Sequence, residues 1–97
     1  MKCVVNTSYG GFCVPREVQE LLSVSMWGMP LDNKDNYYDI RFDPKFIEWV
    51  ENHEGETSLA VAEIPEDATD WEISEYDGVE HIIAVVDGFI RHIWSRR

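Results

Sequence analysis

Two Asp-Gly pairs, at 77–78 and 87–88, divide the last third of this 97-residue chain into short apolar runs. Asp tolerates a positive φ and Gly prefers one, so each pair is a strong short-range signal for a two-residue hairpin turn of type I′. Two such turns in succession predict a three-strand antiparallel meander. Its strands are expected at 71–76, 79–86 and 89–94.

Asp77 and Asp87 are interpreted as turn residues and not as a catalytic or metal-binding pair of carboxylates. The strand between them has eight residues, and at about 3.3 Å per residue it holds the two turns more than about 20 Å apart. The two carboxylates therefore cannot share a site.

Two-residue turns also fix the pairing of the strands, because each residue of one strand then has a defined partner on the next. The expected pairs are Tyr76 with Val79, Ile73 with Ile82, Val86 with Phe89, Ile83 with His92, and His81 with Trp94. The face that we expect the helices to cover holds Trp71, Ile73, Ile82, Ala84, Val86, Phe89 and Ile93. The opposite face holds Tyr76, Val79, His81, Ile83, Val85, Ile90, His92 and Trp94. This second face is too apolar for an ordinary solvated surface, so we expect a loop, a second subunit or a partner to lie on it.

The first part of the chain predicts a strand followed by a helix. The run KCVVNTSY is β-branched and ends at Gly10 and Gly11, which indicates a strand closed by a glycine turn. Pro15 suits the first position of a helix. An apolar stripe at helical spacing is formed by Val14, Val18, Leu21, Leu22 and Ser25.

The middle of the chain predicts a loop, a second helix and a strand. Residues 26–36 have no period and contain Gly and Pro, so they are expected to form a long loop, and YYDIRF at 37–42 a short extended piece. Asp43 and Pro44 are typical of a helix N-cap and first residue, and Phe46, Ile47 and Val50 would face the core. This helix should stop near Gly55, and SLAVAEI at 58–64 predicts a strand.

These elements predict one α+β domain over residues 1–97. We expect an antiparallel sheet of about four to five strands, with a C-terminal three-strand meander and two helices packed on one face.

Charge is distributed unevenly. The net charge is −11, and no Lys or Arg occurs between residues 46 and 90 while acids are frequent there. Such a surface repels a phosphate backbone, which argues against direct binding of nucleic acid. An acidic surface can simply be solvated, but it can also dock on a basic site of a protein. The expected partner-binding acids are Glu63, Glu66, Asp67, Asp70, Glu72, Glu75 and Glu80.

Two further groups are candidate binding sites. His81 and His92 would be diagonal neighbours on the second face, and the candidate site there comprises Ser74, His81, Ile83, His92 and Trp94. Two histidines without a third ligand are a weak metal signal, and histidines satisfied by neighbours are commoner. The turn of Thr7, Ser8, Gly10 and Gly11 could face an anion, although it lacks the spacing of known phosphate loops and a structural turn is favoured.

The remaining composition predicts a protein of the cytoplasm without cofactor or metal. Neither Cys3 nor Cys13 stands in a CxxC pattern, so reduced thiols are expected. No stretch has the length and apolar character of a membrane span or a signal peptide, so no membrane contact is expected.

Three segments resemble a family of small proteins encoded by tailed phages and prophages. They are YGGF at 9–12, DIRFDP at 39–44 and AEIPEDATDWEISEYDGVE at 62–80. Members of that family often end in His-Arg-x-Trp, whereas this chain has Arg91-His92-Ile93-Trp94. The family has no assigned activity, so the resemblance implies a source in an infected or lysogenic bacterium and a role among host proteins.

The leading hypothesis is a non-enzymatic accessory protein that binds and modulates a host protein in host takeover or anti-defence, with imitation of nucleic acid as one form of that binding. The first alternative is a protein that binds a small molecule, a nucleotide or a metal through the His81 and His92 face and the Gly10-Gly11 turn. The second is a structural protein that forms a homodimer through the second sheet face.

Overall fold

The computed structural model describes residues 1–31 and 39–94. Along the chain these residues form β1 (Lys2–Asn6), α1 (Arg16–Leu22), the 3-10 helix η2 (Ile40–Phe42), α2 (Pro44–Asn52), β2 (Leu59–Glu63), β3 (Asp70–Tyr76), β4 (Val79–Val86) and β5 (Phe89–Ile93). The predicted α+β class is confirmed. The predicted single sheet is instead two antiparallel sheets in the described residues, one of β1 and β2 and one in the order β3-β4-β5.

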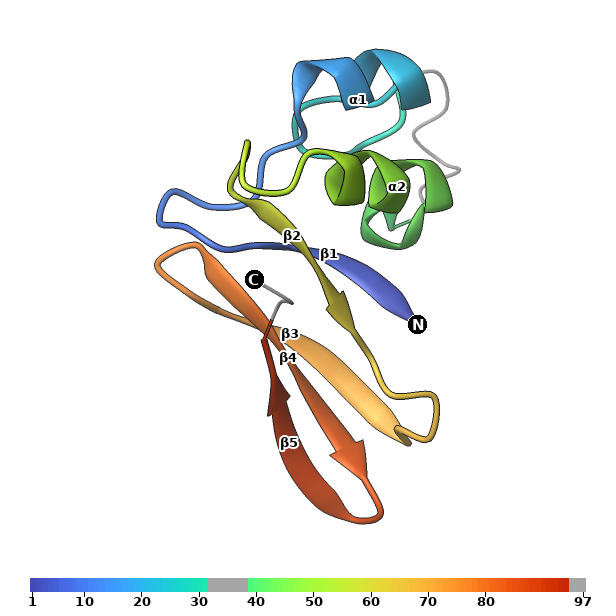
Figure 1. Cartoon of the computed structure of the whole chain (residues 1–97), viewed down its shortest axis with the longest axis vertical. Coiled ribbons are helices and arrows are strands. Elements are labelled where there is room, and N and C mark those ends of the chain that lie inside the picture. Colours follow the sequence, from blue (N-terminus) through green and yellow to red (C-terminus); the bar gives the residue numbers. More distant parts are fainter. Residues whose placement is uncertain (32–38, 95–97) are drawn as a thin grey trace.

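The elements are arranged in three layers (Figure 1). The helices lie on one side of the β1–β2 pair, and the β3–β4–β5 sheet lies on its other side. One cluster of buried side chains joins the helices to the β1–β2 pair and includes Val4, Phe46 and Val61. A second cluster joins the β1–β2 pair to the other sheet and includes Cys3, Ala62 and Ile82.

The sequence of β1 and β2 explains why they form the middle layer. Residues 3–6 and 59–62 are buried without interruption, so both faces of this small sheet are covered. The side toward β4 carries small side chains such as Cys3 and Ala62, which lets the two sheets approach closely.

The expectation that the helices cover the inner face of the meander is therefore wrong. Ile82 and Ala84 of that face pack on the β1–β2 pair, and Phe89 at its end is largely exposed. The β1–β2 pair is apolar on both sides, so it packs on the meander with one side and on the helices with the other. The residues of the meander alone show which of its faces is buried but not which element buries it.

The local signals of the helices are mostly confirmed. The Asp43 carboxylate accepts a hydrogen bond from the Lys45 N–H at 2.8 Å, and Pro44 opens α2 as predicted. Pro15 lies at the N-cap of α1, one residue before the first helical position that was predicted for it, and its carbonyl accepts a hydrogen bond from the Gln19 N–H at 3.0 Å. Leu21 of the predicted apolar stripe is exposed and not buried.

The YYDIRF segment differs from its prediction. Residues 40–42 form the helix η2 instead of an extended piece, because the Asp39 side chain accepts a hydrogen bond from the Arg41 N–H and starts a helical turn. Residues 37 and 38 lie outside the described residues, as do 32–36 of the predicted loop. Pro30, in the described part of that loop, pairs in a single β-bridge with Val24, which precedes the loop.

Both Asp-Gly pairs form the predicted turns. Asp77 and Gly78 have φ of 52° and 92°, and Asp87 and Gly88 have 53° and 81°, as type I′ geometry requires. The turns lie at opposite ends of β4, so the prediction that Asp77 and Asp87 are turn residues is confirmed. The strand pairing is also confirmed from Tyr76 opposite Val79 to Ile83 opposite His92.

Candidate functional site: the outer face of the three-stranded sheet

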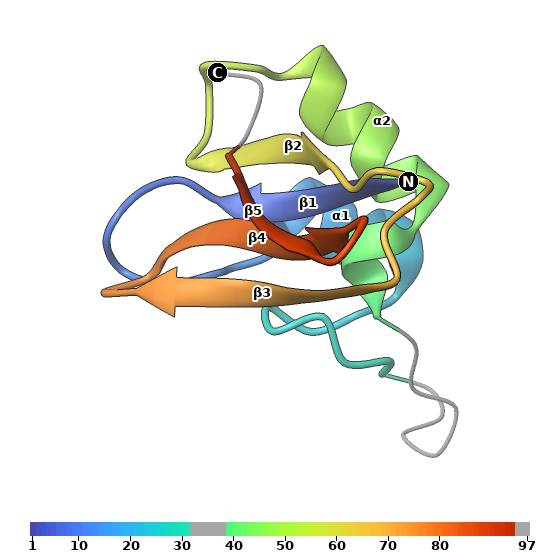
Figure 2. The same cartoon turned by 90° about the horizontal axis from the view of Figure 1, so that it is seen from below.

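The outer face of the β3–β4–β5 sheet is turned away from the β1–β2 pair, and no element of the described residues covers it (Figure 2). Tyr76, Ile90 and Trp94 on this side are exposed at 76%, 68% and 59% of their surface. A surface with such apolar content is unusual for a solvated strand face. We call it the outer face below.

The strand register arranges the outer face in rows that run across the sheet. One row is Asp70, Val85 and Ile90, and the next is Glu72, Ile83 and His92. In each row the β3 residue is acidic and the β4 residue is aliphatic. In these two rows the face therefore has an acidic border on β3 and an aliphatic surface on β4, followed on β5 by Ile90 and His92.

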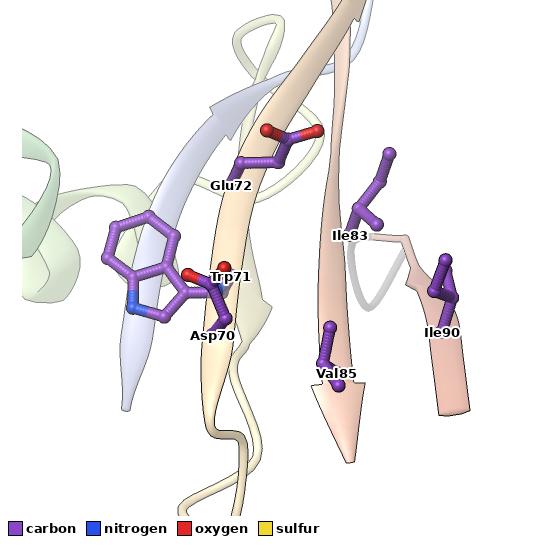
Figure 3. A pocket seen from close by; sticks show the side chains of 6 residues that line it. All are labelled: Asp70, Trp71, Glu72, Ile83, Val85 and Ile90. Atoms are coloured by element: carbon purple, nitrogen blue, oxygen red, sulfur yellow. The ribbon is translucent and has the colours of Figure 1, made fainter. Parts of the chain in front are cut away.

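A shallow depression of about 270 Å³ lies on these two rows (Figure 3). Its walls and floor come from all three strands. The lining residues are Asp70, Trp71, Glu72, Ile83, Val85 and Ile90. The Trp71 ring turns away to the far side of β3, where it packs on Phe42 with ring centres 5.2 Å apart.

An aromatic stack joins the second row to His81 of β4 and to Trp94 just after β5. The His81 ring lies between the His92 ring and the Trp94 ring, with centroids 5.2 Å and 4.1 Å away. His81 Nε2 and His92 Nδ1 are 3.0 Å apart and share a hydrogen bond. Burial, with a smaller contribution from the charge of His92, lowers the pKa of His81 from its ordinary value of 6.5.

This histidine pair does not form a metal centre with other described residues. Among residues 1–31 and 39–94, no three His, Cys, Asp or Glu side chains are grouped so that they could hold a metal ion. Each imidazole nitrogen in the short contact already has its partner on the other ring.

The seven predicted partner-binding acids do not form one patch. Asp70 and Glu72 lie together on the outer face, while Glu66 and Asp67 lie on the connection between β2 and β3. Glu63 ends β2, with a carboxylate oxygen 3.9 Å from the N-terminal ammonium. Glu75 belongs to the opposite face of β3, where its carboxylate accepts a hydrogen bond from the Gly78 N–H.

Glu80 does not belong to the predicted acidic surface, because only 7% of its own surface is exposed. The Arg41 guanidinium binds both of its carboxylate oxygens, at 2.6 Å and 2.7 Å. The Asn6 N–H donates a third hydrogen bond to this carboxylate at 2.8 Å. Glu80 is therefore part of the interior and unavailable to a partner.

The predicted anion turn is occupied by contacts within the protein. The Gly10 N–H points at the Asp77 carbonyl, 3.3 Å away, and the Ser8 carbonyl accepts from the Asn6 side chain. The Thr7 hydroxyl donates to the Ser58 carbonyl. The Gly10 contact fastens the first loop to the β3–β4 turn, and the Thr7 contact fastens it to the residue before β2. Both contacts support the structural interpretation of the glycines.

The Arg41–Glu80 pair and Asn6 were not predicted as a cluster. Arg41 stacks on the Phe12 ring, 3.8 Å from its centre, and donates to the Val4 carbonyl at 3.1 Å. One signal was present in the sequence: the alternation of β4 places Glu80 on the same face as Ile82 and Ala84. A carboxylate on a buried face is costly in free energy unless a cation pairs with it.

Comparisons of the chain with protein-family models, with curated proteins and with solved structures found no match. In the described residues, no helix has the length and apolar character needed to cross a bilayer. The outer face must therefore be interpreted from its own chemistry.

Proposed function

We propose that this chain is a non-enzymatic accessory protein that binds another protein through the outer face. The observation that carries the proposal is the exposure of Ile90 and Trp94 beside Ile83 and Val85, on a sheet face that the described residues leave uncovered. Apolar surface buried on association contributes roughly 25 cal/mol per Å², and aromatic side chains are enriched in protein interfaces.

The resemblance to small phage and prophage proteins supports a host protein in the bacterial cytoplasm as the partner. Modulation of that host protein is the role that we propose. The partner would bind mainly through the apolar side chains of the outer face and less through the acids, because Glu80 is buried and Glu75 lies on the opposite face of β3. Imitation of nucleic acid by the whole set of acids has less support from this arrangement.

Affinity capture from a bacterial host lysate tests the proposal when it is done with matched variants. Ile90→Glu places a charge on the outer face, and Leu21→Glu places the same charge on an exposed leucine of α1. Both positions are solvent-exposed, so both variants should unfold at the same urea concentration as the wild type.

We expect the wild type and Leu21→Glu to recover the same host protein, and Ile90→Glu to lose it. Equal recovery by all three proteins, or no specific protein in any of them, would refute binding through the outer face. Light scattering on the purified chain identifies the competing case: a homodimer that Ile90→Glu dissociates would mean that a second copy occupies the face.

A further inference from the structure

The two rows that form the depression share a direction. Reading from β5 to β3, one row passes from Ile90 through Val85 to the Asp70 carboxylate, and the other passes from Ile83 of β4 to the Glu72 carboxylate. Neighbouring strands are about 4.8 Å apart, so each row is about 10 Å long. Figure 3 shows the two carboxylate groups of Asp70 and Glu72 on β3, with Ile83, Val85 and Ile90 on the other two strands.

The chemistry of these rows favours one type of occupant. A purely apolar side chain would cover Ile83, Val85 and Ile90 but would leave two carboxylates beside it without a counter-charge. Asp70 and Glu72 belong to no group of three His, Cys, Asp or Glu side chains in the described residues that could hold a metal ion. A long aliphatic stem that ends in a cation matches both the floor and the border.

The Asp70 carboxylate is positioned for such a contact by its own strand. One of its oxygens accepts a hydrogen bond from the Trp71 N–H at 2.9 Å, which holds the side chain at the border of β3. The surrounding charge acts in the same direction, because the chain has no Lys or Arg between residues 46 and 90. A cation that approaches this border therefore meets the two carboxylates on a chain whose net charge is −11.

We infer that the outer face takes a lysine or arginine side chain from an otherwise apolar segment of the partner protein. Its stem lies across Ile90 and Val85, and its charged head lies between Asp70 and Glu72. This inference rests on the proposed function, and it adds the chemistry by which the partner is recognised.

Titration with designed peptides tests the inference. The probe is a synthetic amphipathic helix with a leucine stripe flanked by lysines, and its control has glutamates in place of the lysines. Binding is followed by the fluorescence of the protein's tryptophans, with a tryptophan-free peptide, and by NMR shifts of the Ile83, Val85 and Ile90 methyl groups.

Two double variants each neutralise two carboxylates, one pair on the outer face and one pair elsewhere. Asp70→Asn with Glu72→Gln neutralises the border of the outer face, and the asparagine can still accept from the Trp71 N–H. Glu66→Gln with Asp67→Asn neutralises two exposed acids on the β2–β3 connection. One exposed ion pair contributes up to about 1 kcal/mol, or about fivefold in affinity.

We expect the lysine peptide to bind with saturable shifts at the three methyl groups, and the glutamate peptide to bind at least tenfold more weakly. The border variant should lose roughly tenfold or more of that affinity, and the connection variant less than about twofold at 0.15 M salt. No saturable binding of the lysine peptide, or equal losses in the two variants, would overturn the inference. Saturable shifts of the same methyl groups with spermidine, in the absence of peptide binding, would assign the border to a small polyamine and also overturn the inference.

The same variants separate this inference from the proposed function. If Ile90→Glu loses the host protein while the border variant retains it, the outer face binds a protein without a cation, and only the inference fails. If Ile90→Glu retains the host protein, the proposed function itself fails.

Discussion

Arg41 and Glu80 form a bidentate ion pair in the interior, with guanidinium nitrogens 2.6 Å and 2.7 Å from the two carboxylate oxygens. They are 39 residues apart in the chain, and they join the segment between the helices to the first half of β4. Through the Asn6 N–H the carboxylate also contacts β1. This pair therefore connects all three layers of the fold.

Removal of either charge should destabilise the protein strongly. Arg41→Met leaves the buried Glu80 carboxylate without a cation, and loss of one partner of a buried ion pair costs about 3–5 kcal/mol. Urea unfolding should show this loss for the single variant and a much smaller additional loss when Glu80→Gln is combined with it. The exposed Arg16–Glu20 pair, 3.9 Å apart, is the control and should contribute less than about 0.5 kcal/mol. Additive effects of Arg41→Met and Glu80→Gln would contradict the coupling.

The two hairpin glycines should respond differently to the same substitution. Gly78 has φ of 92°, and a Cβ there would lie 2.2 Å from the Gly11 nitrogen and 2.8 Å from the Gly10 nitrogen. Gly88 has φ of 81°, but nothing lies within 4 Å of its Cβ position. Gly88→Ala should therefore cost only about 1 kcal/mol for the backbone conformation, whereas Gly78→Ala should cost about 3 kcal/mol or more, because the first loop must move away. Equal midpoints in thermal unfolding would show that the two turns do not pack as described.

The parts of the fold that could be predicted from sequence are those with local causes. The Asp-Gly turns fix their own geometry and hence the register, and Asp43 with Pro44 starts α2 through contacts within one turn. The order of the layers could not be predicted, because it depends on which apolar face meets which. The burial of β1 and β2 on both sides becomes visible only when the other layers are in place.

The candidate site could be predicted in part for the same reason. The register placed His81, Ile83 and His92 on one exposed face correctly. Grouping the acids by charge and not by strand face misplaced Glu80, whose partner Arg41 is distant in sequence. The same grouping concealed the border that Asp70 and Glu72 form with the aliphatic rows.

The two cysteines should differ in reactivity. Cys3 is fully buried, and burial raises the pKa of its thiol to about 12, while the Arg41 charge acts in the opposite direction. The reactive form of a thiol is the thiolate, so iodoacetamide at pH 8 should modify the exposed Cys13 and leave Cys3 intact in the folded protein. Mass mapping of the alkylated peptides checks this. Rapid labelling of Cys3 under native conditions would contradict its burial.

The same thiol should make stability depend on alkaline pH. In the unfolded chain the thiol ionises near its ordinary value of 9.0, whereas in the folded protein it stays protonated to about 12. Over this range the unfolded state binds fewer protons, so the stability that is present below pH 9 is lost progressively as the pH rises. Cys3→Ala should reduce this slope in urea unfolding between pH 8 and pH 10, and Cys13→Ala should not. Equal slopes in the two variants would show that Cys3 does not carry the dependence.

His81 stacks on both His92 and Trp94, so both neighbours should affect the pKa of the His81 imidazole. Burial is the main cause that lowers the pKa of His81, and the charge of His92 is the second. Trp94→Ala exposes the ring and should raise this pKa more than His92→Gln, which removes only the second cause. NMR titration of the His81 ring protons between pH 4 and pH 8 measures both, with Leu21→Ser on α1 as the control. A lowered pKa means that the folded state binds fewer protons than the unfolded state, so His81 contributes a loss of stability as the pH falls below 6.5. If the pKa of His81 is the same in all four proteins, neither the stack nor the charge of His92 controls it.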